Sequence, residues 1–260
     1  MHELEVVLVP QLQDNYAYLL ICKSTQKAAI VDCPEADKMI EVIESKGVTP
    51  VAILNTHHHW DHINGNRDLI ARYSKIKVYG HHSDKERIPG MTYPLQEGDI
   101  VTFGEVSAKV FFTPGHTNGH ISYYFEQTGD LFCGDVMFYG GCGRLFEGTA
   151  AQMHTSFQKL GALPHETRVY CGHEYTASNL RFAAKVDPDN AIIQQKLDEV
   201  ATLRAENKPT IPSTIGVEWQ VNPFLRVEQP AIKQSAANTG ADSSDPAAVF
   251  GAIRELKNNS

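Results

Sequence analysis

The stretch Thr56-His57-His58-His59-Trp60-Asp61-His62 places four histidines and an aspartate within six residues. Neutral imidazole is the commonest metal ligand in proteins, and carboxylates join it for borderline cations. No packing role requires so many imidazoles in so short a segment. We therefore interpret the stretch as part of a metal site. The alternative interpretation is a polar, histidine-rich surface loop that binds metal only fortuitously.

The sequence on either side of the histidines favours the metal site. The apolar run Val51–Leu54 comes just before them and predicts a buried strand. Turn residues follow at positions 64–66, and a helix is expected over residues 67–73. A metal site requires ligands that are held tightly, and the end of a rigid strand provides that support.

An expected strand followed by a candidate ligand occurs at three more places. Strand 107–112 leads to His116, strand 131–133 leads to Asp135, and strand 168–171 leads to His173. His120 begins a further expected strand, over residues 120–125, and we interpret it as a packed or hydrogen-bonded histidine, with a metal ligand as the alternative. The complete set of candidate ligands is His57, His59, Asp61, His62, His116, Asp135 and His173. One tetrahedral ion takes three or four ligands, so seven suit two ions that share a bridging carboxylate.

The remaining pattern predicts an α/β region followed by a helical region. Further strands are expected over 4–9, 16–22, 28–31, 77–79 and 100–103, with helices over 35–46, closed by Gly47, and 151–160, capped by Thr149. Beyond Tyr175 we expect helices over 179–186, 191–206 and 245–256, and an exposed loop over 235–245. We therefore divide the chain into residues 1–175, which carry the metal site, and residues 176–260, a helical domain.

Composition narrows the partners and the compartment. The 260 residues carry a net charge of −8, which does not favour a nucleic-acid partner. No apolar run approaches the roughly 18 residues that span a bilayer, and no secretory signal or transit peptide is evident at the start. The five cysteines include no C-x-x-C pair, which favours reduced thiols in the cytoplasm, although Cys142 is an alternative nucleophile. We expect a small-molecule substrate, no membrane partner and a monomer.

The pattern of His57, His59, Asp61 and His62 after a hydrophobic strand resembles the signature of the metallo-β-lactamase superfamily. Four more stretches resemble glyoxalase II, the hydroxyacylglutathione hydrolase family: Asp14–Tyr16, Gly141–Thr149, Tyr170–Thr176 and Asn222–Arg226. Together they cover nearly the whole chain. The resemblance implies an α/β fold, the metallo-β-lactamase αββα sandwich, followed by a small all-α C-terminal domain that binds substrate.

The resemblance also distributes the metal ligands over two divalent ions per chain. It assigns His57, His59 and His116 to the first ion, it assigns Asp61, His62 and His173 to the second, and it makes Asp135 the bridge beside a bridging hydroxide. Zinc is expected, with iron or manganese as alternatives. Two close cations lower the pKa of the bridging water and polarise a carbonyl, and Asp61 and Asp135 would orient the hydroxide. The expected reaction is hydrolysis of an ester-like bond.

The implied substrate is S-D-lactoylglutathione or a related 2-hydroxyacylglutathione, hydrolysed to D-lactate and glutathione in the second step of methylglyoxal detoxification. The implied substrate contacts are Arg144, Phe146, Tyr175, Arg254 and Lys257. Arg254 and Lys257 lie three residues apart on one helix and could hold a carboxylate, but on the residues alone they suit the charged end of a solvated helix. Some family members carry Tyr in place of Phe146 and Lys in place of Arg144, so we expect the difference to act on substrate affinity.

Three other functions fit parts of the pattern. A β-lactamase would share the ligands but has little use for a helical C-terminal domain with a basic pair. A persulfide dioxygenase would use one iron, whereas seven candidate ligands suit two ions. A non-enzymatic metal-binding or RNA-processing scaffold would hydrolyse no thioester, and the acidic charge weakens its RNA-binding version.

Overall fold

The chain divides into two units. The computed structural model describes residues 3–260. The first unit contains the described residues up to 112 together with 119–134, and the second contains residues 113–118 and 135–260.

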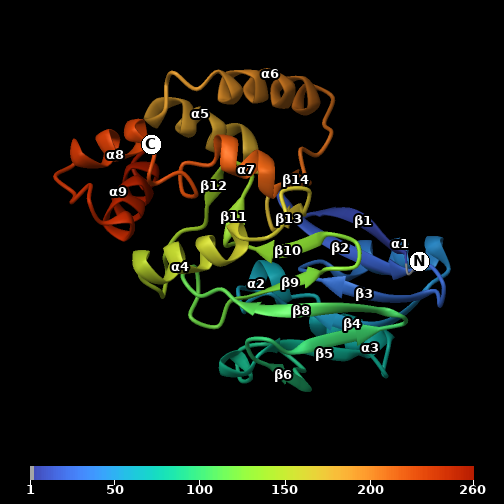
Figure 1. Ribbon diagram of the computed structural model, residues 1–260. Helices are drawn as coiled ribbons and strands as arrows, with labels where there is room; N and C mark the ends of the chain where they lie inside the picture. Colours follow the sequence, from blue (N-terminus) through green and yellow to red (C-terminus); the bar gives the residue numbers. More distant parts are fainter. Residues whose placement is uncertain (1–2) are drawn as a thin grey trace. The chain divides into compact units, whose positions relative to one another are not determined.

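The first sheet of the first unit has six strands in the order of the chain. They are β1 (Leu4–Gln11), β2 (Asn15–Cys22), β3 (Lys27–Val31), β4 (Thr49–Leu54), β5 (Lys77–His81) and β6 (Tyr93–Leu95) (Figure 1). β1, β2 and β3 pair antiparallel, whereas β3 to β6 pair parallel. Val31 at the end of β3 lies opposite Leu54 at the end of β4. The residues that follow these two strands therefore leave the sheet at the same edge.

Three helices and one turn connect the parallel strands. They are α1 (Ala36–Lys46), α2 (Trp60–Ile63), α3 (Asn66–Arg72) and the 3₁₀ turn η1 (His82–Asp84). Met39 and Ile43 of α1 belong to the same buried core as Leu19 and Ile30 of the sheet, because the apolar face of α1 lies on the strands. Gly47 ends α1 in the left-handed conformation, with φ of 64°, as its place in the sequence predicts.

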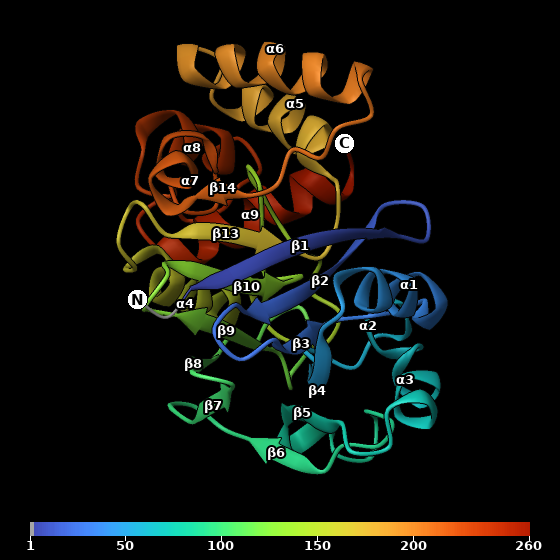
Figure 2. The same cartoon turned by 90° about the vertical axis from the view of Figure 1, so that its right-hand side faces the viewer.

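The second sheet of the first unit is antiparallel. It contains β7 (Ile100–Phe103), β8 (Val106–Phe112), β9 (Ile121–Phe125) and β10 (Asp130–Gly134). The ring of Tyr18 in β2 lies 5.3 Å from the ring of Phe132 in β10, so the two sheets face each other. Every residue of β2 is buried, because the second sheet covers one face of the strand and α1 covers the other (Figure 2).

The second unit is mainly helical. Its strands are β11 (Met137–Phe138), paired with β12 (Gly141–Cys142), and β13 (Arg168–Cys171), paired with β14 (Ser213–Thr214). Its helices are α4 (Ala150–Gly161), α5 (Thr176–Val186), α6 (Ala191–Ala205), α7 (Ile215–Val221), α8 (Pro230–Ala237) and α9 (Pro246–Asn258). The rings of Phe157, Phe224 and Phe250 lie between 5.1 and 6.1 Å apart and join α4 to α9 at the core.

Most predicted elements are confirmed, including the α/β class and the helical C-terminal region. The prediction of an exposed loop over 235–245 is wrong at its start, because residues 235–237 complete α8 and Ala236 is fully buried. Small residues carry little periodic signal, and here they pack inside the helical unit. Short elements such as α2 and α7 were also not predicted.

The cysteines carry free thiols in the structure. All five cysteines are buried thiols, as predicted. Burial raises the pKa of the Cys142 thiol to about 12, which disfavours the alternative of a Cys142 nucleophile.

Within residues 3–260, no helix has the length and apolar character needed to cross a membrane.

Candidate metal centre

Four predicted ligands follow β4 in the first unit. His57 and His59 lie in the loop after the strand, while Asp61 and His62 belong to α2. The distance between His57 Nε2 and His59 Nδ1 is 3.1 Å, and His62 Nε2 lies 3.8 Å from Asp61 Oδ2. Two nitrogen ligands of one tetrahedral zinc lie roughly 3.3 Å apart, because each Zn–N bond is about 2.0–2.1 Å long. The spacing of His57 and His59 therefore suits a shared cation.

Asp32 and Thr56 form hydrogen bonds with Nδ1 of His62 and Nδ1 of His57, respectively. His62 Nδ1 lies 3.0 Å from Asp32 Oδ2, and the Thr56 hydroxyl donates to the same oxygen at 2.6 Å. Because the Thr56 proton goes to Asp32, His57 Nδ1 donates to Thr56 Oγ1 at 3.0 Å. A metal-binding imidazole commonly donates its second N–H to such an acceptor, which fixes the ring and its tautomer. Both rings thus present Nε2 as the nitrogen for a metal.

His58 lies between two candidate ligands but has different partners. Its Nδ1 lies 3.2 Å from Asp84 Oδ2, and its Nε2 lies 3.1 Å from Arg87 Nη1. Asp84 is fully buried, and although burial raises the pKa of its carboxyl, hydrogen bonds from His58 and Arg87 hold that pKa below its usual range. Both nitrogens of His58 therefore have protein partners, which agrees with its absence from the predicted ligands.

The other three predicted ligands converge within the second unit. Asp135 Oδ2 lies 3.5 Å from His116 Nε2 and 3.3 Å from His173 Nε2. His116 Nδ1 donates to the carbonyl oxygen of Arg144 at 2.8 Å, which turns His116 Nε2 toward Asp135. One carboxylate oxygen therefore lies within 3.5 Å of a nitrogen of each imidazole.

The predicted ligands thus form two groups, four residues in the first unit and three in the second. All three side chains of the second group are buried. Both groups combine imidazole nitrogen with carboxylate oxygen, the donor set that divalent zinc, iron and manganese accept. The residues therefore fit a divalent metal.

All five predicted substrate residues lie in the second unit. Phe146 is 62% exposed, and its ring lies 5.3 Å from the ring of His116. Tyr175 stacks on His173, with ring centres 4.8 Å apart. Arg254 is buried, and its Nη1 donates to the carbonyl oxygen of Cys142. Lys257 Nζ donates to the carbonyl oxygen of Ser178 at 3.1 Å.

Arg254 and Lys257 belong to a local concentration of positive charge. Burial, together with the charges of Arg254, Arg181 and Lys185, lowers the pKa of Lys257 to about 8. Arg144 acts on Arg254 in the same direction. We call these five residues the basic cluster: Arg144, Arg181, Lys185, Arg254 and Lys257. Like charges repel one another, so a bound anion would stabilise the cluster.

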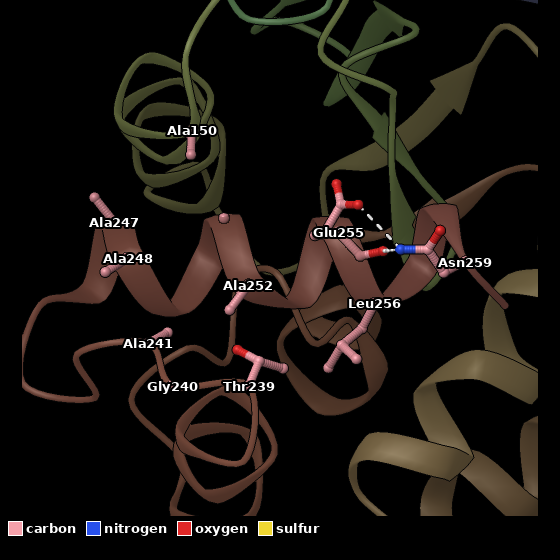
Figure 3. Close-up of a pocket in the computed structure, with 11 residues that line it drawn as sticks. Ala150, Thr239, Gly240, Ala241, Ala247, Ala248, Ala252, Glu255, Leu256 and Asn259 are labelled. Atoms are coloured by element: carbon pink, nitrogen blue, oxygen red, sulfur yellow. Dashed lines mark hydrogen bonds between the residues drawn. The ribbon is translucent and has the colours of Figure 1, made fainter.

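A groove of about 670 Å³ lies along α9, and neither Arg254 nor Lys257 lines it (Figure 3). Residues from α9, the loop before it and the start of α4 line the groove, and most of them are alanine or glycine. Glu255 is the only charged residue in the lining, and it accepts a hydrogen bond from Asn259. This side of α9 therefore offers no positive charge for an anionic ligand.

The sequence interpretation gave no role to several residues that hold the ligands. Asp32 and Thr56 hold the rings of His62 and His57, and Asn15 donates to Asp61 Oδ2 at 3.1 Å. Asp84 holds His58. Asp32 directly follows β3, so the same signal of a polar residue at a strand end could have identified it.

Both parts of the chain match models of known protein families. Residues 13–173 match the family model of the metallo-beta-lactamase superfamily, and residues 174–260 match that of the hydroxyacylglutathione hydrolase C-terminus. A hydroxyacylglutathione hydrolase of Synechococcus sp. is 52% identical over 254 residues, which cover 98% of this chain and 99% of the relative. The chain belongs to the hydroxyacylglutathione hydrolase family.

Further family members and solved structures agree with this assignment. A hydroxyacylglutathione hydrolase of Synechocystis sp. is 47% identical over 261 residues, which cover 98% of this chain and all of the relative. The solved B3 metallo-beta-lactamase BLEG-1 has 27% identity and a TM-score of 0.66, over 85% of this chain and 99% of that one. ETHE1 from Myxococcus xanthus, at 24% identity and a TM-score of 0.69 over 97% and 90% of the two chains, shares the fold. The hydroxyacylglutathione hydrolase fold is thus a metallo-β-lactamase fold with a helical C-terminal region.

Proposed function

We propose that this member of the hydroxyacylglutathione hydrolase family hydrolyses the thioester S-D-lactoylglutathione to D-lactate and glutathione. The observation that carries the proposal is the 52% identity to a curated hydroxyacylglutathione hydrolase over nearly the full length of both chains. The similarity includes the C-terminal region that the β-lactamase alternative would not need. The product acid and thiol together match the atoms of the thioester and one water.

Two divalent ions per chain are the proposed cofactors, with zinc first and iron or manganese as alternatives. The proposed ligands are His57, His59 and His116 for one ion, Asp61, His62 and His173 for the other, and Asp135 for both. Spacings of 3.1–3.8 Å between neighbouring ligand atoms within each unit support the assignment. Ions held there would supply a water of lowered pKa and would polarise the thioester carbonyl.

The residues of the chain have separate tasks in this reaction. Asp32 and Thr56 keep Nε2 of His62 and His57 without a proton, so both rings remain ligands. Asn15 donates to Asp61, which fixes the carboxylate that would orient the attacking water. The departing group is a thiolate, and its low basicity means that no residue has to protonate it.

The basic cluster is the proposed site for the glutathione carboxylates. Arg254 Nε is buried and has no hydrogen-bond partner within the described chain, so a carboxylate there would satisfy it. Lys257 would add a point charge, while Arg144, Phe146 and Tyr175 would contact the substrate nearer to His116 and His173. A substrate with two carboxylates therefore matches the charge of this cluster better than an uncharged ester.

We also propose that residues 1–175 form the catalytic domain and residues 176–260 the substrate-binding domain. The two family models meet between residues 173 and 174, which supports this division in terms of shared ancestry. The cytoplasm is the proposed location, supported by five buried thiols.

The first test is hydrolysis of S-D-lactoylglutathione by the zinc-loaded chain, with metal content measured on the same sample. We expect thioester absorbance to fall rapidly at about two ions per chain. The Asp135→Ala variant should lose both metal and turnover, whereas Asp68→Ala, which removes an exposed carboxylate from α3, should retain both. A chain that binds two zinc ions and leaves this thioester intact would refute the proposed substrate.

A further inference from the structure

The β11–β12 hairpin carries the metal-ligand region of the second unit at both its ends. Asp135 lies two residues before the hairpin, and Arg144, whose carbonyl oxygen holds His116, lies two residues after it. The backbone of Gly143 approaches so closely that a Cβ there would lie 1.9 Å from the carbonyl oxygen of Asp135. Gly143 N also donates to the carbonyl oxygen of Val136 at 3.1 Å. A displacement of the hairpin would therefore move Asp135 and the acceptor of His116 together.

Side chains from three helices bind the backbone of this hairpin. Asn222, directly after α7, donates to the carbonyl oxygens of Phe138 at 3.2 Å and Gly141 at 2.9 Å. Asn179 of α5 donates to Tyr139, and Arg254 of α9 donates to Cys142. The carbonyl oxygens of residues 138, 139, 141 and 142 thus all accept hydrogen bonds from helix side chains.

Glu218 of α7 accepts a hydrogen bond from the backbone amide of Gly140 in the hairpin and another from Asn222. Its Oε2 accepts from Gly140 N at 2.9 Å and from Asn222 Nδ2 at 2.9 Å, and its Oε1 accepts from Ser213 Oγ at 2.5 Å. Glu218 and Asn222 are both fully buried. Burial raises the pKa of Glu218 to about 7, although its hydrogen-bond donors oppose the rise. A buried carboxyl is costly, so it must contribute something that an apolar side chain would not.

We infer that Glu218 and Asn222 are positioning residues for the metal ligands: they fix the β11–β12 hairpin and so hold Asp135 and the Arg144 carbonyl in place for metal binding. The helical region then has a second task besides binding substrate. The inference rests on the proposed assignment of Asp135 and His116 as ligands. Both positioning residues bind the hairpin backbone, and neither is among the proposed metal ligands or substrate contacts.

The test compares zinc affinity in three variants by competition with a chromophoric chelator, with Zn²⁺ as the only added ligand. Glu218→Met keeps about the length of the side chain but removes the acceptor of Gly140 and Asn222, and Asn222→Ala removes the donors to residues 138 and 141. We expect either change to weaken binding of at least one zinc ion by about tenfold to 100-fold, the usual effect of losing a residue that supports a ligand.

Trp219→Phe is the matched control on the same helix. It removes the hydrogen bond from Trp219 Nε1 to the carbonyl oxygen of Gly161, which does not involve the hairpin. Zinc affinity should remain within about twofold of the original, even where the midpoint of thermal unfolding falls as far as in the other variants. Folded Glu218→Met or Asn222→Ala protein with unchanged zinc affinity would overturn the inference.

A measurement on the unaltered chain covers the case in which the variants do not fold. Coupling between two sites is reciprocal, so zinc must stabilise the hairpin if the hairpin supports zinc binding. We expect hydrogen exchange of the Gly140 and Gly143 amides to slow on zinc addition by a larger factor than exchange in α6. An equal factor in both segments would contradict the inference. Because these readouts use zinc alone, failure to hydrolyse the thioester would refute only the proposed function.

Discussion

Asp32 illustrates how a single residue can support the candidate centre at some cost. Its φ is 44°, in the left-handed region that non-glycine residues seldom occupy, at a cost of about 1–3 kcal/mol. Its carboxylate accepts three hydrogen bonds, from Thr56 N, Thr56 Oγ1 and His62 Nδ1. Hydrogen bonds to a charged acceptor contribute about 1.5–3 kcal/mol each, which offsets the strain. The strained backbone therefore persists where it orients a proposed ligand.

Lys257 gives a prediction for the pH dependence of substrate binding. Because burial and neighbouring cations lower its pKa to about 8, its ammonium loses its charge as the pH rises through that value. The positive charge is present below pH 8 and lost above it, so we expect KM for S-D-lactoylglutathione to rise between pH 7 and 9.5, with a smaller change in kcat. Steady-state kinetics across this range measure both parameters.

Lys257→Arg serves as the matched variant, because arginine keeps its charge throughout the range. Its KM should stay nearly constant where that of the original chain rises. Any rise shared by both proteins reports titration of the substrate instead. Identical KM profiles for the two proteins would show that Lys257 does not bind the glutathione moiety.

At the scale of elements, the N-terminal cap of α9 makes a measurable contribution to stability. Asp245 Oδ1 accepts a hydrogen bond from Ala247 N at 2.9 Å, and Pro246 begins the helix. Replacing Asp245 by Ala should cost about 1 kcal/mol, because one amide at the helix start loses its acceptor. For a chain of this size the midpoint of thermal unfolding should fall by about 2–4 °C, which calorimetry can measure.

The Asp245→Asn variant separates the cap from its charge. Asparagine caps a helix about as well as aspartate but does not interact as a charge with the helix dipole. We therefore expect it to lose only a few tenths of a kcal/mol relative to Asp245. A loss as large as that of Asp245→Ala would mean that charge, and not the cap, is the main contribution.

At the scale of the whole molecule, the proposed ligands come from both units. Four belong to the first unit and three to the second. An ion bound at about 1,000 times its dissociation constant stabilises the folded state by about 4 kcal/mol. We expect removal of metal by a chelator to lower the midpoint of thermal unfolding by about 10 °C, and zinc to restore it.

Asp135→Ala is the reference for this experiment, because it lacks the proposed bridging carboxylate. Its midpoint should respond much less to chelator and to zinc than that of the original chain. Equal midpoints for the metal-free and zinc-loaded original chain would contradict metal binding by the folded state. Calorimetry at a fixed zinc concentration provides both values.

The sequence alone predicted the elements that have strong local signals. The strand before His57, the strands before His116, Asp135 and His173, and helix α1 with its terminal Gly47 are all confirmed. Hydrophobic periodicity and turn chemistry act over a few residues, so they can be read without the fold. The dense histidine stretch likewise indicated a metal site before any contact was known.

The sequence by itself therefore determined the class of fold, the family resemblance and the candidate ligands. Only the tertiary structure decided which distant residues support them. Asp32 and His62 form a hydrogen bond although they are 30 residues apart in the sequence. Glu218 and Gly140 are 78 residues apart, and Arg254 and Cys142 are 112 apart, yet each pair also forms a hydrogen bond. Such pairs depend on how strands and helices pack, and periodicity carries no information about that packing. Buried polar groups must find partners wherever the fold brings them, so these contacts become visible only when the chain has folded.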